Sequence, residues 1–240
     1  MRVVLVHGSG GNARSAWASV QPLAARFAVV APDRGGYPPN PPLERIDFEV
    51  QAEELAPLLE DGAHLVGHSY GGVIALLIAA RHPRRVRSLT VSEPPAFALA
   101  RGKPEVERLV ERLDEHFTHG PRDPRAFAVG FLGIVGSNAK LPDELPPELE
   151  QVIRATMAER PPWEARIPLE ELEATPFPKL VISGAHHPAF DGVCDVLEER
   201  LGAVRGVLPG AGHSIPRAPG YVERLEAFLD DSAGTEQFPR

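Results

Sequence analysis

The chain has 240 residues, of which 43% are hydrophobic and 24% charged, as is typical of a folded globular protein. Its formal net charge of -8 provides no excess of basic groups to neutralise phosphates, so nucleic acid is not an expected partner. The N-terminus does not resemble a signal peptide, and no stretch approaches the roughly 20 apolar residues of a membrane span. We therefore expect a cytoplasmic protein that does not bind a membrane. The only cysteine, Cys194, permits no intrachain disulfide and is expected to pack as a small apolar residue.

Short apolar runs alternate with helical patterns in two parts of the chain. The expected strands are residues 3–6, 27–31, 64–67, 86–92, 179–183 and 204–208. The expected helices are residues 14–26, 48–60, 73–82, 189–201 and 219–230. This alternation predicts an α/β fold, with a mostly parallel, doubly wound sheet that carries helices on both faces.

Residues 96–172 differ, because strand signals vanish and helical stretches are separated by proline-rich joints. We expect these residues to form a helical cap over a core made of residues 1–95 and 173–231. Residues 232–240 are expected to be a C-terminal tail. The aromatic residues of the cap either wall an apolar pocket or form the interior of the cap itself; they include Phe97, Phe127, Phe131 and Trp163.

The carboxyl ends of parallel strands meet along one edge of a sheet, and ligands bind at that edge in such folds. In this chain the expected edge collects polar and charged side chains from several strand ends: Ser9, Asp33, Ser69, Glu93, His186 and His213. The predicted cap leaves the core from the same edge. It is therefore expected to cover a site there.

The segment Gly67-His68-Ser69-Tyr70-Gly71 matches the pattern G-x-S-x-G and joins an apolar strand to an apolar helix. In such a turn the serine adopts a strained backbone conformation, and small neighbours let strand and helix approach each other. The turn also places the hydroxyl at a helix N-terminus, where N–H groups favour developing negative charge. A plain turn with a capping serine is the alternative interpretation.

Together with three further motifs, this segment resembles the α/β-hydrolase family over the whole chain. The motifs, in chain order, are an H-G pair, a D-x-G loop and a G-x-G-H loop: His7-Gly8, Asp33-Arg34-Gly35 and Gly210-Ala211-Gly212-His213. The chain begins directly at the strand that precedes the H-G pair. We therefore expect a sheet of the α/β-hydrolase type that lacks the first strands of larger members.

The resemblance implies a serine nucleophile and a histidine base. Ser69 would be the nucleophile, and His213 would be the base that takes its proton. The backbone N–H groups of Ser9 and Tyr70 would form the oxyanion hole. His7 and His68 are expected to have structural roles, with His68 pointing away into the packing beside the elbow.

A carboxylate that orients His213 would complete a catalytic triad with Ser69, and the sequence offers more than one candidate. The family often places an aspartate after the strand that here spans residues 179–183, but His187 occupies that position. Asp191 follows later and is most simply the N-cap of the next helix. Glu93, at the end of the neighbouring strand and followed by two prolines, is the preferred acid. Asp191 is the alternative, and a site without any carboxylate is the third possibility.

These observations predict a serine hydrolase that cleaves a small carboxylic ester or related acyl compound through an acyl-enzyme. The alternatives are a lyase or C–C bond hydrolase with the same triad, or a non-catalytic small-molecule receptor on the same fold. No cofactor is expected. Adjacent histidines such as His186 and His187 rarely hold one ion well, so no metal is expected either. The sequence does not identify the substrate, and it leaves a homodimer open.

Overall fold

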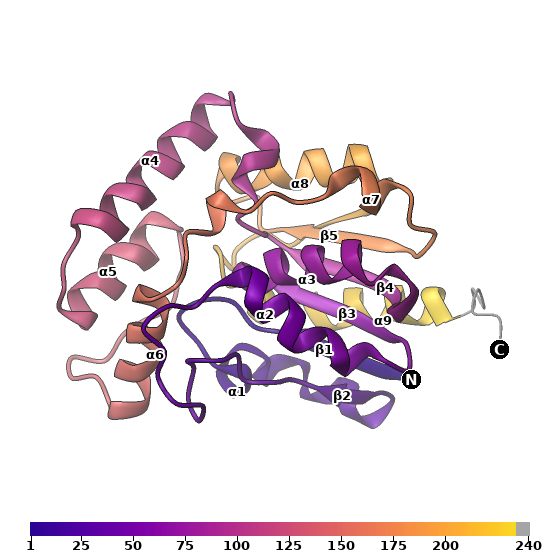
Figure 1. The fold of residues 1–240 in the computed structure, drawn as a ribbon, viewed down its shortest axis with the longest axis horizontal. Coiled ribbons are helices and arrows are strands. Elements are labelled where there is room, and N and C mark those ends of the chain that lie inside the picture. Colours follow the sequence, from indigo (N-terminus) through magenta and orange to yellow (C-terminus); the bar gives the residue numbers. More distant parts are fainter. Residues whose placement is uncertain (234–240) are drawn as a thin grey trace.

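The computed structural model describes residues 1–233. Within this range six strands form one parallel sheet, in the order β2-β1-β3-β4-β5-β6 (Figure 1). The strands are β1 (Arg2–Val6), β2 (Ala28–Val30), β3 (Ala63–His68), β4 (Val86–Ser92), β5 (Lys179–Ser183) and β6 (Val204–Val207). All six predicted strands are present, and the predicted parallel sheet is confirmed.

The helices of the core alternate with these strands. They are α1 (Ala13–Ala16), α2 (Phe48–Leu55), α3 (Tyr70–Arg81), α7 (Leu169–Glu173), α8 (Pro188–Leu201) and α9 (Tyr221–Ala233). Short 3-10 helices also connect elements of the chain: Ala18–Ala25, Ala56–Leu59, Pro83–Arg85, Phe97–Ala100, Pro162–Glu164 and Ile215–Arg217.

Two of the predicted helices are wrong in extent, and proline is the physical reason. The helix expected over residues 14–26 is a short α1 followed by a 3-10 helix that contains Pro22. The helix expected over residues 48–60 gives way to a 3-10 helix that contains Pro57. Proline has no N–H to donate and crowds the preceding turn, so a regular α-helix does not continue through it.

Strand β2 also differs from its prediction, because its residues are partly or fully exposed rather than buried. It lies at the edge of the sheet, where it pairs with β1 alone. An apolar run in the sequence cannot distinguish a central strand from an edge strand, since both satisfy the same pattern.

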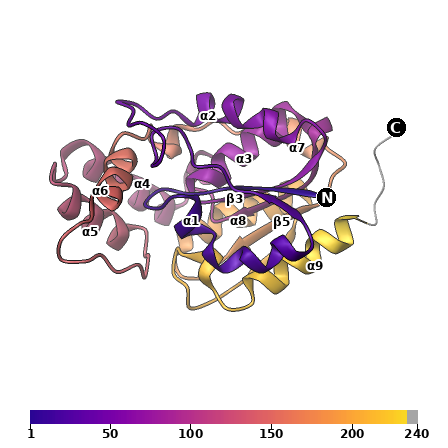
Figure 2. The ribbon, with the colours of Figure 1, turned by 90° about the horizontal axis from the view of Figure 1, so that it is seen from below.

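Side chains of successive strand residues enter two separate cores, one on each face of the sheet. Val4 and Val6 of β1 belong to the larger core, whereas Val3 and Leu5 belong to the smaller one. Helices α2, α3, α7 and α8 cover the larger core, and α1 and α9 cover the opposite face (Figure 2). The doubly wound arrangement is thereby confirmed.

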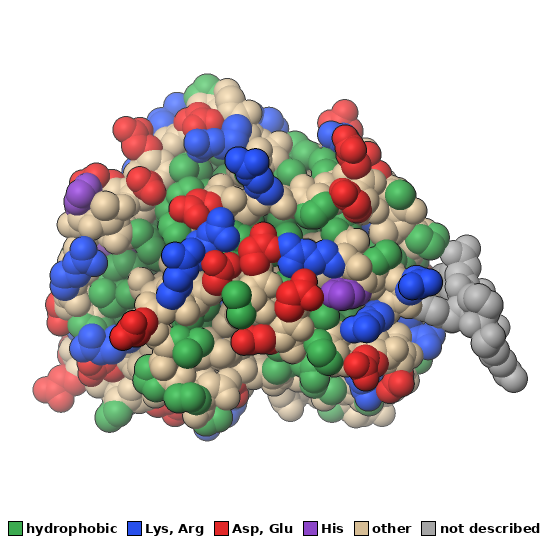
Figure 3. Space-filling view, in the orientation of Figure 1, with side chains coloured by type: hydrophobic (Ala, Val, Ile, Leu, Met, Phe, Trp, Pro, Cys, Tyr) green, Lys and Arg blue, Asp and Glu red, His purple; other side chains and the backbone are tan. Residues whose placement is uncertain are grey.

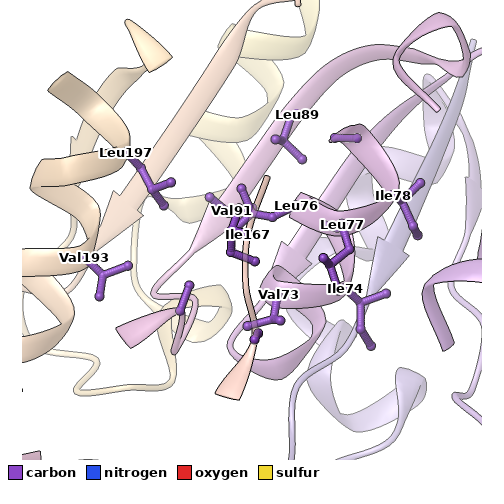
Figure 4. Packing of buried hydrophobic residues seen from close by; sticks show 14 of the residues in the cluster. Val73, Ile74, Leu76, Leu77, Ile78, Leu89, Val91, Ile167, Val193 and Leu197 are labelled. Carbon is purple, nitrogen blue, oxygen red and sulfur yellow. The ribbon is translucent and has the colours of Figure 1, made fainter. Parts of the chain in front are cut away.

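Helix α3 is the centre of the larger core. All of its residues from Tyr70 to Ala80 are buried. Figure 4 shows its apolar side chains packed against Leu89 and Val91 of β4, Ile167, and Val193 and Leu197 of α8. A helix that is apolar on every side must be enclosed by other elements, as this one is. Its first residues, which follow Ser69, are therefore held rigidly.

Helices α4 (Pro104–His119), α5 (Pro124–Ile134) and α6 (Pro147–Met157) lie beyond the carboxyl ends of the strands (Figure 1). The division into core and cap at residues 96 and 172 stays a prediction. Near its second boundary, Ala165, Ile167 and Leu172 belong to the larger core.

Two residues of the expected tail, 232 and 233, extend helix α9, and residues 234–240 lie outside the described part of the chain. The face shown in Figure 3 intersperses acidic and basic side chains and carries no extended field of one sign. Within residues 1–233, no helix has both the length and the apolar composition required to cross a membrane.

Candidate active site

The turn between β3 and α3 carries Ser69 in a backbone conformation that is rare for a residue with a side chain. Its φ is 53° and its ψ is -126°. A Cβ at Gly67 would overlap the carbonyl oxygen of Gly71, and a Cβ at Gly71 would overlap that of Val6. Only glycine fits at these two positions. This is the physical reason for the spacing of the motif, and it is how the turn presents the serine hydroxyl at the sheet edge.

The structure brings Ser69, His213 and Glu93 together from three separate parts of the chain. His213 Nε2 lies 2.9 Å from Ser69 Oγ, and His213 Nδ1 lies 2.8 Å from Glu93 Oε2. An ionised carboxylate only accepts, so Nδ1–H donates to Glu93 and Nε2 is left to accept the serine proton. The ring of His213 stacks on Phe190 at a centroid distance of 4.3 Å, which holds its plane.

Glu93 follows the last residue of β4, and its side chain is 1% exposed. Its second oxygen, Oε1, accepts from Gly184 N at 2.7 Å and faces His186 Nδ1 at 3.1 Å. Burial alone would raise the pKa of Glu93, but hydrogen bonds and charge from His186 and His213 outweigh it and lower the pKa to about 2. Glu93 is therefore an anion at neutral pH.

Asp191 and His187, the other residues weighed for the acid position, lie in different surroundings. Asp191 lies on helix α8, and its carboxylate pairs with Arg205 of β6 at 3.3 Å. The N-cap of α8 is His187, whose Nδ1 accepts from Ala189 N, so the expectation that Asp191 caps this helix is wrong. His187 Nδ1 accepts from a backbone N–H of the first helical turn, as the side-chain oxygen of an Asn or Asp cap would. Histidine is not a usual N-cap residue, so the sequence gives no sign of this role.

The loop after β1 passes directly over the elbow. A Cβ at Gly8 would lie 2.8 Å from Ser69 Cβ. Within residues 1–233, no acceptor receives a hydrogen bond from the backbone N–H of Ser9 or of Tyr70. Two such donors beside a serine hydroxyl are the groups that an oxyanion requires.

The two neighbours of Ser69 in the chain, Tyr70 and His68, have different surroundings. Tyr70 is buried against Phe48 and therefore does not line a pocket. His68 Nε2–H donates to the carbonyl oxygen of His213 at 2.8 Å, so the expectation that it points away into packing misses this contact. Burial and the neighbouring His213 lower the pKa of His68 to about 3, which keeps the ring neutral.

His7 joins the loop after β1 to the loop after β2. Its Nε2 accepts from Arg34 N at 3.1 Å, so Nδ1–H donates to the carbonyl oxygen of Gly8 at 2.8 Å. Burial, together with the charge of Arg34, lowers the pKa of His7 well below its usual value. Asp33 fastens the same region, because its Oδ1 accepts from Ala13 N at 2.8 Å.

A buried ion pair joins the cap to this region. Arg34 Nη2 donates to Glu159 Oε1 at 2.7 Å, with both side chains 2% exposed or less, and the same nitrogen donates to the carbonyl oxygen of Gly8. Glu159 also accepts from the hydroxyls of Tyr37 and Ser9, at 2.7 and 2.5 Å. Every residue that donates to the Glu159 carboxylate is distant in sequence. Because Glu159 follows an ordinary amphipathic helix, no local pattern could have indicated it.

Glu159→Ala is expected to lower the free energy of unfolding by about 3–5 kcal/mol, because it leaves Arg34 buried without its counter-ion. A matched control is Glu164→Ala, which removes a carboxylate that is half exposed and pairs with Arg160. That change should cost less than about 1 kcal/mol. Urea unfolding of both variants measures the difference. Equal losses would contradict the importance of the buried pair.

Cavities of unequal size adjoin Ser69. One, lined by Ser69, has a volume of about 80 Å³ and shares several lining residues with a larger cavity of about 340 Å³; the two adjoining cavities are here called the cleft. The cleft runs between the loop after β1 and the cap, where its walls include Phe127, Phe131 and Ile153. A third cavity, of about 20 Å³, lies beneath the cap and is walled by apolar side chains, including Trp163, Phe131 and Phe190.

Of the four cap aromatics singled out from the sequence, Phe127, Phe131 and Trp163 therefore line cavities. Phe97 does not, because it is fully buried against Phe190.

Glu93, His186 and His213 could also be considered as metal ligands, since one potential ligand atom of each lies within 4.8 Å of the others. Both rings direct a nitrogen to the carboxylate of Glu93, one to each oxygen. An ion at this point would have to replace the hydrogen bond between Glu93 and His213. The arrangement is therefore explained by hydrogen bonding among the three side chains.

The fold and the elbow are those of a doubly wound hydrolase, and comparison with known families agrees. A model of the alpha/beta hydrolase family matches residues 3–225. The chain belongs to this family.

Individual relatives are similar over parts of the chain. A pimeloyl-[acyl-carrier protein] methyl ester esterase of Aeromonas hydrophila is 37% identical over 99 residues, covering 40% of this chain and 39% of that protein. The protein of the same name from Chromobacterium violaceum is 35% identical over 122 residues, covering 48% of each. The matches thus span less than half the length of these relatives.

Structural similarity covers more of the chain than these sequence matches do. The crystal structure of a membrane phospholipase A, described as a novel bacterial virulence factor, superposes with a TM-score of 0.72 and 26% identity. The superposition covers 98% of this chain and 80% of that one.

Proposed function

We propose that the protein is a serine hydrolase that cleaves a carboxylic ester or a related acyl compound through an acyl-enzyme. The observation that carries the proposal is the hydrogen-bonded series from Ser69 through His213 to Glu93, with distances of 2.9 and 2.8 Å. A nucleophile, a base and a group that orients the base are the three elements that activate a serine hydroxyl.

In the proposed mechanism, Ser69 Oγ attacks the carbonyl carbon of the ester while His213 Nε2 accepts the hydroxyl proton. The Ser9 and Tyr70 N–H groups stabilise the oxyanion. The C–O bond of the ester then breaks, and the departing alcohol takes the proton from His213. Water then gives a proton to the same nitrogen and attacks the acyl carbon. The bond from that carbon to Ser69 Oγ breaks as the oxygen takes the proton back from His213, which releases the acid and restores the serine.

Glu93 supports the positive charge that His213 carries in both steps and keeps its Nδ1 protonated. The receptor alternative depended on the absence of an acid, and the 2.8 Å distance between Glu93 and His213 argues against it. The cytoplasmic location and a homodimer stay predictions of the sequence.

The cavities favour an ester with one small and one extended substituent. The cavity beneath the cap, about 20 Å³, has room for little more than one water-sized group, whereas the cleft is much larger and is lined by apolar side chains together with charged ones such as Arg14 and Lys140. The names of the relatives, which are methyl ester esterases, fit this asymmetry. We therefore propose methyl or comparably small esters of extended acyl groups as the substrate class.

A series of esters in which the alcohol part and the acyl part are lengthened separately tests this proposal. Enlarging the small substituent from methyl to propyl should lower kcat/KM about tenfold or more, while lengthening the other substituent should have much less effect. Trp163→Ala should relax the first preference, because Trp163 walls the small cavity. Phe127→Ala, which removes a side chain that lines the cleft and not the small cavity, is the matched control. Equal dependence on both substituents would contradict the proposed substrate class.

A further inference from the structure

His186 contacts the Glu93 oxygen that does not face His213. It follows β5, one residue before His187. Its Nδ1 lies 3.1 Å from Glu93 Oε1, while His213 contacts the other oxygen, Oε2, of the same carboxylate. Glu93 is therefore held by a histidine at each of its two oxygens.

The second nitrogen of His186 also faces an acceptor, the carbonyl oxygen of Val135 at 3.1 Å. A neutral imidazole has one N–H and can satisfy only one of these acceptors, whereas an imidazolium satisfies both. Burial would lower the pKa of His186, but the hydrogen bond and charge of Glu93 and the carbonyl group of Val135 outweigh it and raise the pKa.

The ring of His186 is fixed by tight packing. It stacks on Phe190 with an interplanar angle of 26°, and Phe190 also stacks on His213. On the cap side, a Cβ at Gly136 would lie 2.8 Å from His186 Cδ2. Gly136 has a φ of 68°, so it can adopt this turn without the strain that a larger residue would suffer.

Residues 135–137 of the cap, which contact His186, also bind the loop that carries His213. The carbonyl oxygen of Gly136 accepts from His213 N at 3.1 Å, and Ser137 forms an antiparallel bridge with Gly212. Residues 135–137 thus contact the base loop by backbone bonds and the acid through His186. A change in the cap would reach both His213 and Glu93.

We propose that His186 is a positioning residue, present as an imidazolium that links Glu93 to the cap at Val135 and keeps the carboxylate directed at His213. This inference rests on the proposed function of the same site. In this family the position after β5 often supplies the acid, but here His187 occupies it. The role of His186 explains how Glu93, which follows β4, is held in place instead. The imidazolium contributes a hydrogen bond and also a fixed positive charge.

That charge has a defined effect on the pH profile. Glu93 is shared by two rings, so a cation at His186 reduces the stabilisation that Glu93 can offer to protonated His213. Other charged groups near His186 are His187 and Asp191 on α8, and Arg112 on α4 acts on His187. Removing the charge of His186 should therefore move the acid limb of kcat/KM to higher pH, by an amount on the order of one pH unit.

The protonation state can be measured without any substrate. Side-chain 1H–15N NMR of the histidines, with His186 assigned from its absence in His186→Asn, should show both nitrogens protonated and a titration midpoint above 6.5. A midpoint at or below 6.5 would overturn the imidazolium. This measurement also separates the two proposals, because a wild type without esterase activity would refute the proposed function and leave the NMR result standing.

Two isosteric variants separate the two hydrogen bonds. In His186→Asn the amide nitrogen takes the place of Nδ1 and can still donate to Glu93, whereas in His186→Gln it takes the place of Nε2 and can reach only Val135. We expect His186→Gln to lower kcat roughly ten- to hundredfold with little change in KM, since Glu93 loses its alignment. His186→Asn should stay within a few-fold of the wild-type kcat.

Both variants should show the shifted acid limb, because neither carries a charge. His187→Asn is the matched control, since asparagine preserves the helix cap and should leave kcat and the pH profile unchanged. Wild-type kcat and an unshifted profile in both His186 variants would overturn the positioning role. So would equal losses in the two, which would indicate a general disturbance of packing.

Discussion

Glu93→Gln is expected to lower kcat by about three to four orders of magnitude while KM changes only a few-fold. The amide has nearly the shape of the carboxylate, but it can donate to His213 Nδ1 and so favours the wrong tautomer of the base. It also removes the negative charge that supports protonated His213 during the reaction. The measurement is steady-state hydrolysis of a p-nitrophenyl ester by the purified variant.

The matched control is Asp191→Asn, which should stay within about twofold of the wild-type kcat. Asp191, on helix α8, pairs with Arg205 of β6, and no hydrogen bond joins it to His213 among the residues that the structure describes. If the change at Asp191 were the crippling one, the acid would be assigned to the wrong residue.

The low pKa of Glu93 adds a pH dependence to the same variant. Because the folded pKa of about 2 lies below the ordinary value of 4.5, ionised Glu93 stabilises the fold above about pH 4.5. That contribution is lost as the pH falls towards 2. Glu93→Gln should therefore unfold with a smaller difference in stability between pH 7 and pH 3 than the wild type, as followed by circular dichroism.

The sheet and the elbow were predictable because both depend on local patterns. A buried parallel strand needs a continuous apolar run, and the turn at Ser69 needs small residues at Gly67 and Gly71. The alternation of strands and helices then determines which chain segments share an edge, and so which side chains meet there. The change from α-helix to 3-10 helix in the segments that contain Pro22 and Pro57 was missed because the apolar spacing continues through both prolines.

The remaining parts of the site depend on contacts between residues far apart in sequence. Glu159 meets Arg34, Tyr37 and Ser9 only because the cap folds back over the loop after β1. His186 was placed at the correct edge, but its contact with Val135 requires the course of the cap, which its proline-rich sequence does not determine. The preference for Glu93 over Asp191 rested on its place at the end of the strand that follows the elbow, where parallel strands bring their carboxyl ends to the same edge as Ser69.

The central claim, that Ser69 is the nucleophile, is tested most directly by comparing wild type and Ser69→Ala in hydrolysis of the methyl esters of the series described above, with acid release as the readout. Ser19→Ala, which removes a hydroxyl that donates to the carbonyl oxygen of Pro216 rather than to a residue of the proposed triad, serves as the control, and thermal unfolding confirms that each variant is folded. We predict repeated turnover by the wild type and by Ser19→Ala, with a loss of about 10⁴-fold or more in Ser69→Ala. Turnover by Ser69→Ala at the wild-type rate, or a folded wild type without turnover of any ester in the series, would contradict the account.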